Sequence, residues 1–372
     1  MSERCGFIRA CSGRDITFRF DIGGLMKLKV HAKNRSFEVP ADGGPNLLMA
    51  GLAAGLELPY ACATGTCGSC KARLVSGEVT DHWPAALGKA KCKSDTNEVL
   101  LCQCAAIGDC DIEIAEHVYE VDPGARTPRR YAGAVTRWAM LTADVAIWDI
   151  RLDNSMEFDA GQFALVSVDG VAGHRAYSMV NFDRGTQTLT FLTKKKPGGV
   201  LTEHLFNGSP EGQKLSVIGP LGRAIFRPSL RKNLLCIAGG SGIAGIMSIL
   251  SRATRERYFS QHKGRVFFGI RTLRDAFFLD ELTAYARQFE STLEITIGIS
   301  EGEVSDHLVS QYPFLKISTG FIHEIAAQAV KGNTSNTQIY LAGPTPLVDA
   351  AIRHLLIVEK VDAKNIAYDK FS

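Results

Sequence analysis

The pattern of apolar and polar residues divides the chain into three stretches that differ in period. In the first stretch, short runs of alternating apolar residues flank one segment of helical spacing, 46–56, which Asn46 is placed to cap. A hairpin, a helix and returning strands in this order are typical of a β-grasp domain. The predicted strands cover residues 26–32, 35–39, 71–76, 98–102 and 111–115.

The second stretch consists mainly of strands at short intervals, with one place near Gly199 where a helix can begin. Strands that recur at this spacing favour a small antiparallel β-barrel. The predicted strands cover residues 130–136, 145–152, 163–168, 189–193 and 214–217.

The third stretch alternates buried strands with helices. This alternation predicts a parallel sheet with helical crossovers, which is an α/β fold. The predicted strands cover residues 234–237, 266–270, 293–298 and 338–342. The predicted helices cover residues 243–257, 280–289, 321–330 and 346–358.

Turn and breaker residues separate the first two stretches. Residues 116–130 contain Asp122-Pro123-Gly124 and a second proline, Pro128. We therefore predict a multidomain α+β and α/β protein. Its parts are an N-terminal extension without an assigned function (1–24), a β-grasp domain (25–118), a linker (119–130), a β-barrel domain (131–231) and an α/β domain (232–372).

Composition and charge narrow the function classes. The 372 residues carry a net charge of only +3, which does not indicate a nucleic-acid partner. Ten cysteines without a secretory signal indicate a reducing compartment, so we predict a cytoplasmic protein. The most apolar run, 234–250, is interrupted by Gly239-Gly240-Ser241-Gly242, which predicts a strand, a turn and a helix rather than a membrane span.

Three cysteines in one small-residue loop carry the first chemical motif. Cys62, Cys67 and Cys70 have the C-x4-C-x2-C spacing of plant-type 2Fe–2S sites. A zinc site would more often show two close cysteine pairs or a cysteine–histidine mixture, so we favour the iron–sulfur cluster. Cys102 and Cys104 are only two residues apart, and spacing alone allows either to be the fourth ligand.

Two segments of the predicted barrel form the second motif. Residues 198–202 place two glycines before a hydroxyl at a helix start, where N–H groups can receive a pyrophosphate. Arg175 would pair with the same phosphates, Tyr177 would lie along a flat ring, and Ser178 would donate to a ring nitrogen. Taken alone, residues 175–178 are also compatible with ordinary packing on a strand face.

The third motif lies between a predicted strand and a helix, where residues 239–245 contain G-x-G-x-x-G. A tight turn that serves packing alone is the alternative. Arg271 and Asp275 follow the next strand, where an adenosine ribose is read. An acidic residue at this place favours the free 2′-hydroxyl of NADH, and a basic residue favours the 2′-phosphate of NADPH. We adopt NADH and leave NADPH open. Residues 342–344 end another strand and would flank the nicotinamide.

These three motif sets, in this order, resemble the reductase component of bacterial multicomponent oxygenases. In that family a plant-type ferredoxin is fused to a module similar to ferredoxin–NADP reductases, and the flavin is FAD. The resemblance selects Cys102 as the fourth cluster ligand, through its Leu-x-Cys-Gln pattern. The FAD contacts that it implies are Arg175, Ala176, Tyr177, Ser178, Lys194, Gly198, Gly199, Val200, Leu201, Thr202 and Phe371.

The resemblance also implies a nucleotide site and a catalytic residue. Ser178 is the residue it places near the flavin N5, and we assign it as catalytic. The family usually has proline where Gly245 stands and cysteine where Ala342 stands, so a thiol facing the nicotinamide is not expected here. The implied NAD contacts are Gly239, Gly240, Ser241, Gly242, Arg271, Asp275, Gly343 and Pro344.

The function implied is electron transfer from NADH through FAD and the cluster to an oxygenase. Residues 319–324 and 81–84 resemble reductases of diiron aromatic and alkene monooxygenases. The partner would be a hydroxylase component or an intermediate ferredoxin, with the reductase as a monomer. Alternatives are the reductase of a Rieske dioxygenase, the reductase of a deoxysugar dehydratase, or a non-enzymatic iron–sulfur sensor.

Overall fold

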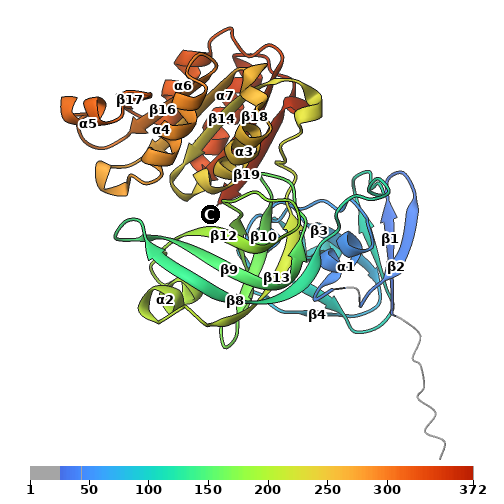
Figure 1. Cartoon of the computed structure of the whole chain (residues 1–372). Helices are drawn as coiled ribbons and strands as arrows, with labels where there is room; N and C mark the ends of the chain where they lie inside the picture. The colour runs from blue at the N-terminus through green and yellow to red at the C-terminus, as the bar shows by residue number, and fades with distance from the viewer. Residues whose placement is uncertain (1–25, 43, 372) are drawn as a thin grey trace, which may run out of the picture.

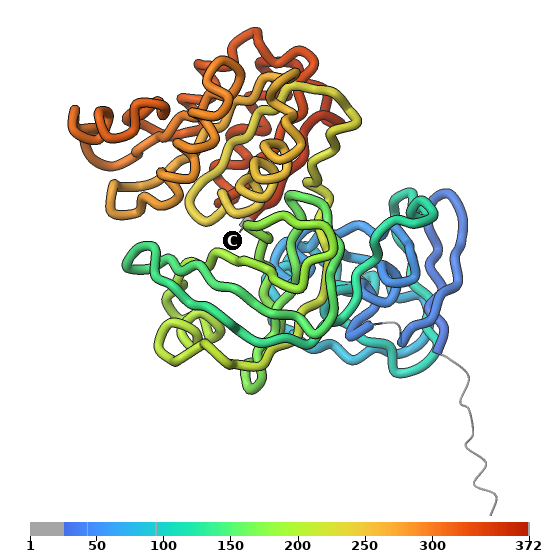
Figure 2. The backbone as a smooth tube through the Cα atoms, viewed as in Figure 1, coloured from blue at the N-terminus to red at the C-terminus, as the bar shows by residue number. Residues whose placement is uncertain are grey.

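The computed structural model of this protein describes residues 26–42 and 44–371. Its three lobes follow the three stretches of sequence, with the first lobe beside the second and the third above the second (Figure 1). The chain trace shows that the C-terminal strand ends where the third lobe meets the second (Figure 2). The predicted N-terminal extension, 1–24, lies outside the described residues.

The first lobe is the predicted β-grasp domain. Its five-stranded sheet has the order β2-β1-β7-β3-β5, in which β1 pairs with β7 in parallel and with β2 antiparallel. Asn46 caps α1 as predicted, since its side chain accepts the Met49 N–H at 3.0 Å. The elements are β1 (Lys27–Ala32), β2 (Ser36–Pro40), α1 (Leu47–Ala53), β3 (Lys71–Ser76), β4 (Val79–Asp81), β5 (Glu98–Leu100), β6 (Cys104–Ala106) and β7 (Cys110–Ile114).

Two details of this lobe differ from the sequence prediction. The strand predicted over 98–102 ends at Leu100, so Cys102 lies in a turn rather than in a strand. The pair β4–β6 forms a small separate sheet that the apolar pattern did not reveal. Strands of three residues are too short to show a period of two.

The second lobe is the predicted antiparallel barrel, with strand order β11-β10-β13-β8-β9-β12. Its strand β8 is longer than predicted, because it begins at Arg129 inside the expected linker and continues to Met140. The elements are β8 (Arg129–Met140), β9 (Val145–Met156), β10 (Phe163–Val168), β11 (Arg175–Ser178), β12 (Thr186–Lys194), α2 (Val200–Asn207) and β13 (Lys214–Leu221).

The third lobe is the predicted α/β domain, whose six strands are all parallel in the order β17-β16-β15-β14-β18-β19. The sequence pattern predicts none of α5, β17 and β19, and Phe371, expected there only as an FAD contact, is the last residue of β19. The elements are β14 (Asn233–Gly239), α3 (Ile243–Arg255), β15 (Gly264–Ile270), α4 (Leu279–Gln288), β16 (Leu293–Ile299), α5 (Asp306–Gln311), β17 (Leu315–Thr319), α6 (Ile322–Val330), β18 (Thr337–Pro344), α7 (Thr345–Ile357) and β19 (Ile366–Phe371). Among the residues described, no helix is long and apolar enough to cross a membrane.

Apolar contacts join the lobes to each other. One face of the barrel packs into the same buried cluster as the core of the β-grasp domain, through Phe163, Leu165, Ile218 and Leu221. On another side, helix α3 of the third lobe shares a core with the barrel. Polar contacts reinforce that second interface. They are the bond from the Ser248 hydroxyl to the Asn181 carbonyl (2.9 Å) and the ion pair of Arg252 with Asp159 (3.0 Å).

The start of α3 gives the first testable prediction. A Cβ on Gly242 would lie 2.5 Å from the Ala342 carbonyl oxygen, whereas a Cβ on Gly245 would meet only ordinary contacts, the nearest at 3.6 Å. Gly242→Ala should therefore lower the free energy of unfolding by about 1–3 kcal/mol, as overpacking does. Gly245→Ala should raise it by about 0.5–1 kcal/mol, because alanine loses less entropy in a helix.

Thermal or urea unfolding of the two variants checks this pair. Each is a single methyl addition within one turn of the same helix, so each serves as the control for the other. Equal shifts of the same sign would contradict the close approach between α3 and β18.

Candidate functional site

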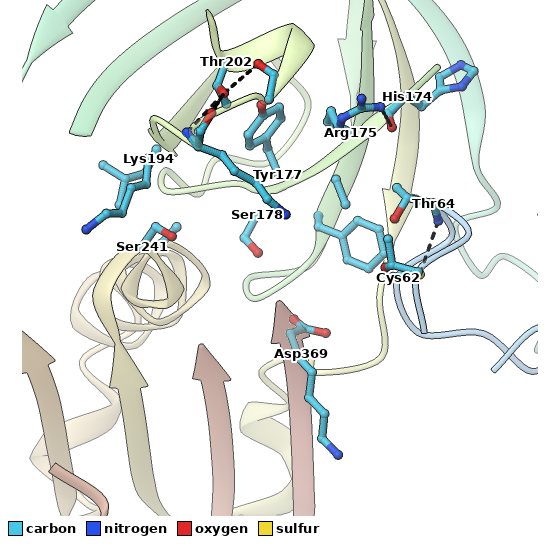
Figure 3. A pocket seen from close by; sticks show the side chains of 18 of the residues that line it. Cys62, Thr64, His174, Arg175, Tyr177, Ser178, Lys194, Thr202, Ser241 and Asp369 are labelled. Atoms are coloured by element: carbon cyan, nitrogen blue, oxygen red, sulfur yellow. Dashed lines mark hydrogen bonds between the residues drawn. The ribbon is translucent and has the colours of Figure 1, made fainter. Parts of the chain in front are cut away.

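A cavity of about 430 Å³ lies where the three lobes meet. Its lining combines all three sequence motifs: Cys62 of the cysteine loop, residues 175–178 of β11, Gly198 and Gly199 before α2, and Ser241 before α3. In the close-up, Ser178 and Ser241 face the same space, while Cys62 and Asp369 approach it from opposite lobes (Figure 3). A group bound here would contact the β-grasp, barrel and α/β domains at once.

The loop of residues 61–70, here called the cluster loop, is shaped to surround sulfur. Gly65 and Gly68 have φ of +82° and +75°, a conformation that other residues rarely adopt. The N–H groups of Thr64 and Cys67 both donate to the Cys62 sulfur at 3.4 Å. N–H donors directed at thiolate sulfur fit a cluster held by these cysteines and tune its potential.

The four predicted ligands meet as two pairs. The Cys70 thiol donates to the Cys102 sulfur at 3.2 Å, and the Cys67 thiol donates to the Cys62 sulfur. These hydrogen bonds lower the pKa of Cys102, and they lower that of Cys62 to about 4. Within the described residues, no three His, Cys, Asp or Glu side chains converge on a single metal-ion position. Two separate thiol pairs suit a two-iron cluster better than one zinc ion.

Cys104 lies elsewhere. It starts β6, is fully buried, and its pKa is raised to about 11 by burial. Cys102, in contrast, also receives the Gln103 side-chain amide at 3.5 Å. The structure thus brings Cys102 to the other three cysteines, which supports the choice that spacing alone left open.

The second sequence motif, residues 175–178 and 198–202, is here called the flavin motif, and it forms the barrel side of the cavity. Arg175 lines it, with one guanidinium N–H donating to the His174 carbonyl at 3.0 Å. The Tyr177 ring stands edge-on to Trp148 with centroids 5.6 Å apart, and burial raises the pKa of its phenol to about 12. Burial and the neighbouring arginines lower the pKa of His174. A neutral tyrosine and a fixed guanidinium suit a flat ring and a phosphate, respectively.

Helix α2 begins at Val200, with Gly199 as its N-cap. The first N–H groups of a helix have no acceptor within it and point towards an incoming anion. The Thr202 hydroxyl is held by the loop, donating to the Gly199 carbonyl at 3.0 Å. The Gly198 N–H already donates to Glu203 at 2.7 Å, so it is a weaker candidate than Val200 or Leu201. The side chain of Leu201 is buried in the core. The side chains of Lys194 and Lys196, which precede the helix, line the cavity.

The remaining predicted FAD contact, Phe371, is the last residue of β19. Its side chain lies outside the described part of the structure, so its predicted position beside the flavin stays a prediction.

A second cavity, of about 530 Å³, lies at the carboxyl ends of the parallel strands. This is where open α/β sheets bind nucleotides. Gly240 has φ +54° and open space around a would-be Cβ, which leaves its backbone accessible to a phosphate. Gly242 instead serves the close packing of α3 on β18. The predicted residues that line this cavity are Gly239, Gly240, Ser241, Arg271, Asp275 and Pro344.

The ribose end of this cavity contains one more acidic side chain than the sequence motif suggested. Arg271 pairs with Glu301 at 3.7 Å. Asp275 accepts the N–H and the hydroxyl of Thr272 at 2.9 and 2.8 Å, so one of its oxygens caps a short 3₁₀ turn. Sequence reasoning missed Glu301, although its place after β16, next to the strand that precedes Arg271, could have revealed it.

Asp369 is a further residue that sequence reasoning missed. It lies on β19 and lines both the flavin cavity and a neighbouring one of about 830 Å³. Burial raises the pKa of its carboxyl to about 7. Its position depends on β19 adding to the sheet edge beside β18, which no local pattern indicated.

Fold and site together define a class: an NAD(P)H oxidoreductase that carries a flavin and an iron–sulfur cluster. Family models cover the three lobes in order. Residues 29–106 match a 2Fe-2S iron-sulfur cluster binding domain, 133–226 an oxidoreductase FAD-binding domain and 236–353 an oxidoreductase NAD-binding domain. The predicted cofactors and the resemblance are therefore confirmed at the level of domains.

Relatives of known activity narrow the class. The chain is 35% identical over 330 residues to the ferredoxin–NAD(P)+ reductase CarAd of Metapseudomonas resinovorans, covering 88% of this chain and 95% of that one. It is 32% identical to the ferredoxin–NAD+ reductase component of the alkene monooxygenase system of Xanthobacter autotrophicus, over 91% and 98% of the two chains. The solved ferredoxin reductase in carbazole 1,9a-dioxygenase superposes with a TM-score of 0.76 at 32% identity, over 93% and 98% of the chains. This chain belongs to the family of ferredoxin–NAD(P)+ reductase components of bacterial multicomponent oxygenases.

The two thiol pairs give the second testable prediction. Cys102→Ser should remove the cluster, because it breaks the pair with Cys70, while Cys104→Ser should keep it. Visible absorbance and iron content of the purified holoprotein check this result. A cluster that survives Cys102→Ser and is lost in Cys104→Ser would contradict the ligand assignment.

The third prediction concerns pH. A carboxyl whose pKa is raised by burial keeps its proton in the folded state up to about pH 7, while the unfolded chain loses it near 3.8. The folded state then binds more protons, so Asp369 lowers stability progressively as pH rises from about 4 to 7, and the loss persists above. Asp369→Asn should raise the melting temperature more at pH 8 than at pH 5. A difference that is constant with pH would contradict the raised pKa.

Proposed function

We propose that this chain oxidises NADH and delivers electrons singly to the oxygenase of a bacterial multicomponent monooxygenase. One observation carries the proposal: a single cavity is lined by the flavin motif, by Ser241 of the nucleotide motif and by Cys62 of the cluster loop. A hydride donor, a flavin and a cluster bound at these positions would be in sequence, without an intervening domain.

Each set of residues has a distinct task in this scheme. When bound, the flavin accepts a hydride as a two-electron unit and releases electrons one at a time, and the cluster accepts single electrons. The protein chain holds the dinucleotide, the flavin and the cluster in position relative to one another. Gly240 and Ser241 would orient the dinucleotide, Arg175 and the start of α2 would hold the FAD phosphates, and Ser178 would donate towards the ring. Apolar side chains such as Phe163 form part of the wall of the same cavity.

NADH is the favoured donor on electrostatic grounds. The nucleotide cavity contains Glu301 and Asp275 together with two cations, Arg271, which is already paired with Glu301, and Lys194. A 2′-phosphate would have to approach both carboxylates, whereas a 2′-hydroxyl could donate to either. The two carboxylates, one of them already paired with Arg271, therefore favour the nucleotide without the phosphate.

The nature of the oxygenase is the finer part of the proposal. The relative from the alkene monooxygenase system supports a monooxygenase partner. A dioxygenase partner is the second candidate, supported by the likeness to the reductase in carbazole 1,9a-dioxygenase.

We also propose the domain borders 25–118, 131–231 and 232–372, and a monomeric state. The eight described cysteines are free, which supports a cytoplasmic location.

The fourth prediction tests this function on the purified full chain. Anaerobic NADH should bleach the flavin absorbance and then the cluster absorbance, and NADPH should require a higher concentration for the same rate. A candidate monooxygenase or dioxygenase added to the mixture should then hydroxylate its substrate. Protein that lacks flavin and cluster absorbance, or that NADH leaves unbleached, would refute the proposal.

A further inference from the structure

The β-grasp domain contacts the rim of the barrel through two polar bonds next to the cluster loop. The Tyr60 hydroxyl accepts the Gly222 N–H at 2.9 Å, and the Arg223 guanidinium donates to the Leu58 carbonyl at 2.9 Å. The guanidinium also lies 5.8 Å from the centre of the Tyr60 ring, within cation–π range. These contacts join residues more than 160 positions apart in the sequence.

Both ends of these contacts are structurally fixed. Leu58 is completely buried in the core of the β-grasp domain. Gly222 directly follows β13 with φ +99°, and a Cβ there would lie 2.9 Å from the Phe163 ring. The rim can therefore present its N–H to Tyr60 only because residue 222 is glycine. Burial raises the pKa of Tyr60, so its phenol stays neutral.

The contacts lie immediately before the first cluster ligand. Ala61 and Cys62 follow Tyr60 and line the flavin cavity together with Phe163. Tyr60, Gly222 and Arg223 line the neighbouring cavity. Two residues line both cavities, Ala61 from the segment that leads into the cluster loop and Asp369 from β19, and Tyr60 and Arg223 join that segment to the barrel.

We propose that Tyr60 and Arg223 are positioning residues for electron transfer between the flavin and the cluster. They fix the segment 58–62 against the barrel rim and so set how closely Cys62 approaches the flavin. This inference rests on the proposed function. In the step concerned, one electron would pass from the reduced flavin to the cluster and convert one ferric ion to ferrous, with NADH as the source of the electron. No heavy-atom bond forms or breaks in that step, so its rate depends on separation and orientation.

A purely structural role would predict loss of docking instead. The apolar interface through Phe163, Leu165, Ile218 and Leu221 is independent of the two polar bonds. Removing the bonds should leave the domains docked and the cofactors bound, while the segment before Cys62 gains freedom. The two roles can therefore be separated by measurement.

The fifth prediction uses Arg223→Met and Tyr60→Phe in the full holoprotein. Tyr60→Phe removes one oxygen and keeps the ring, so it tests the hydrogen bond without disturbing packing. Stopped-flow mixing with NADH should show flavin reduction at the normal rate and cluster reduction slowed by about tenfold in Arg223→Met. That factor corresponds to about 1.4 kcal/mol. Tyr60→Phe should slow the same phase to a smaller extent, and Arg223→Lys should restore part of the rate.

The controls separate positioning from general damage. Ferricyanide reduction, which the flavin supports directly, should be unchanged in every variant, and so should iron and FAD content. Arg227→Met removes a cation from the same rim four residues away and should have no effect on cluster reduction. As a readout independent of activity, the Gly222 amide should exchange hydrogen faster in Tyr60→Phe, because it loses its acceptor.

Two outcomes would overturn the inference. Normal cluster reduction in Arg223→Met and Tyr60→Phe would show that the contacts do not control the step. An equal loss of ferricyanide reduction would show that they support the flavin site as a whole. Failure of NADH to reduce the flavin of the unaltered protein is a different result, because it would refute the proposed function itself.

Discussion

The close packing of the barrel rim around Gly161 and Phe163 is the constraint on which the rest of this molecule depends. A Cβ on Gly161 would lie 2.2 Å from the Ala224 carbonyl oxygen, and its position also faces Ile249 of α3. Two residues on, Phe163 belongs to the buried cluster of the β-grasp domain and lines the flavin cavity. One short segment of the barrel therefore touches both other domains, and the site exists only where all three meet.

Electrostatics distinguishes the two cavities that this packing creates. The flavin cavity is lined by Arg175, Lys194 and Lys196, which suits the two negative charges of a pyrophosphate. The nucleotide cavity shares Lys194 with the flavin cavity and places Arg271 beside Glu301 and Asp275. Arg175 and Lys196 line the flavin cavity alone, and the carboxylates of Glu301 and Asp275 line the nucleotide cavity alone.

The sequence predicted the three domain types, because each has a distinct hydrophobic period or motif spacing over many residues. It also predicted the cysteine loop and both glycine-rich turns, where function depends on residues close together in the chain. It did not predict β19, Asp369, Glu301 or the contact between Tyr60 and Arg223. Each of these depends on strand order or domain docking, so the partners are far apart in sequence and no local pattern identifies them.

The junction between β18 and the nucleotide loop, where Ala342 stands, is closely packed through its glycines. Residue 342 lies in the buried part of β18, and the position of its carbonyl leaves no room for a Cβ on Gly242 at the start of α3. The next residue, Gly343, has φ +144° and would place a Cβ 3.1 Å from the backbone of Gly239. Small residues here allow β18 and the nucleotide loop to approach closely. Hydride transfer needs the alignment of two rings and not a thiol, so the chemistry does not require a cysteine at position 342.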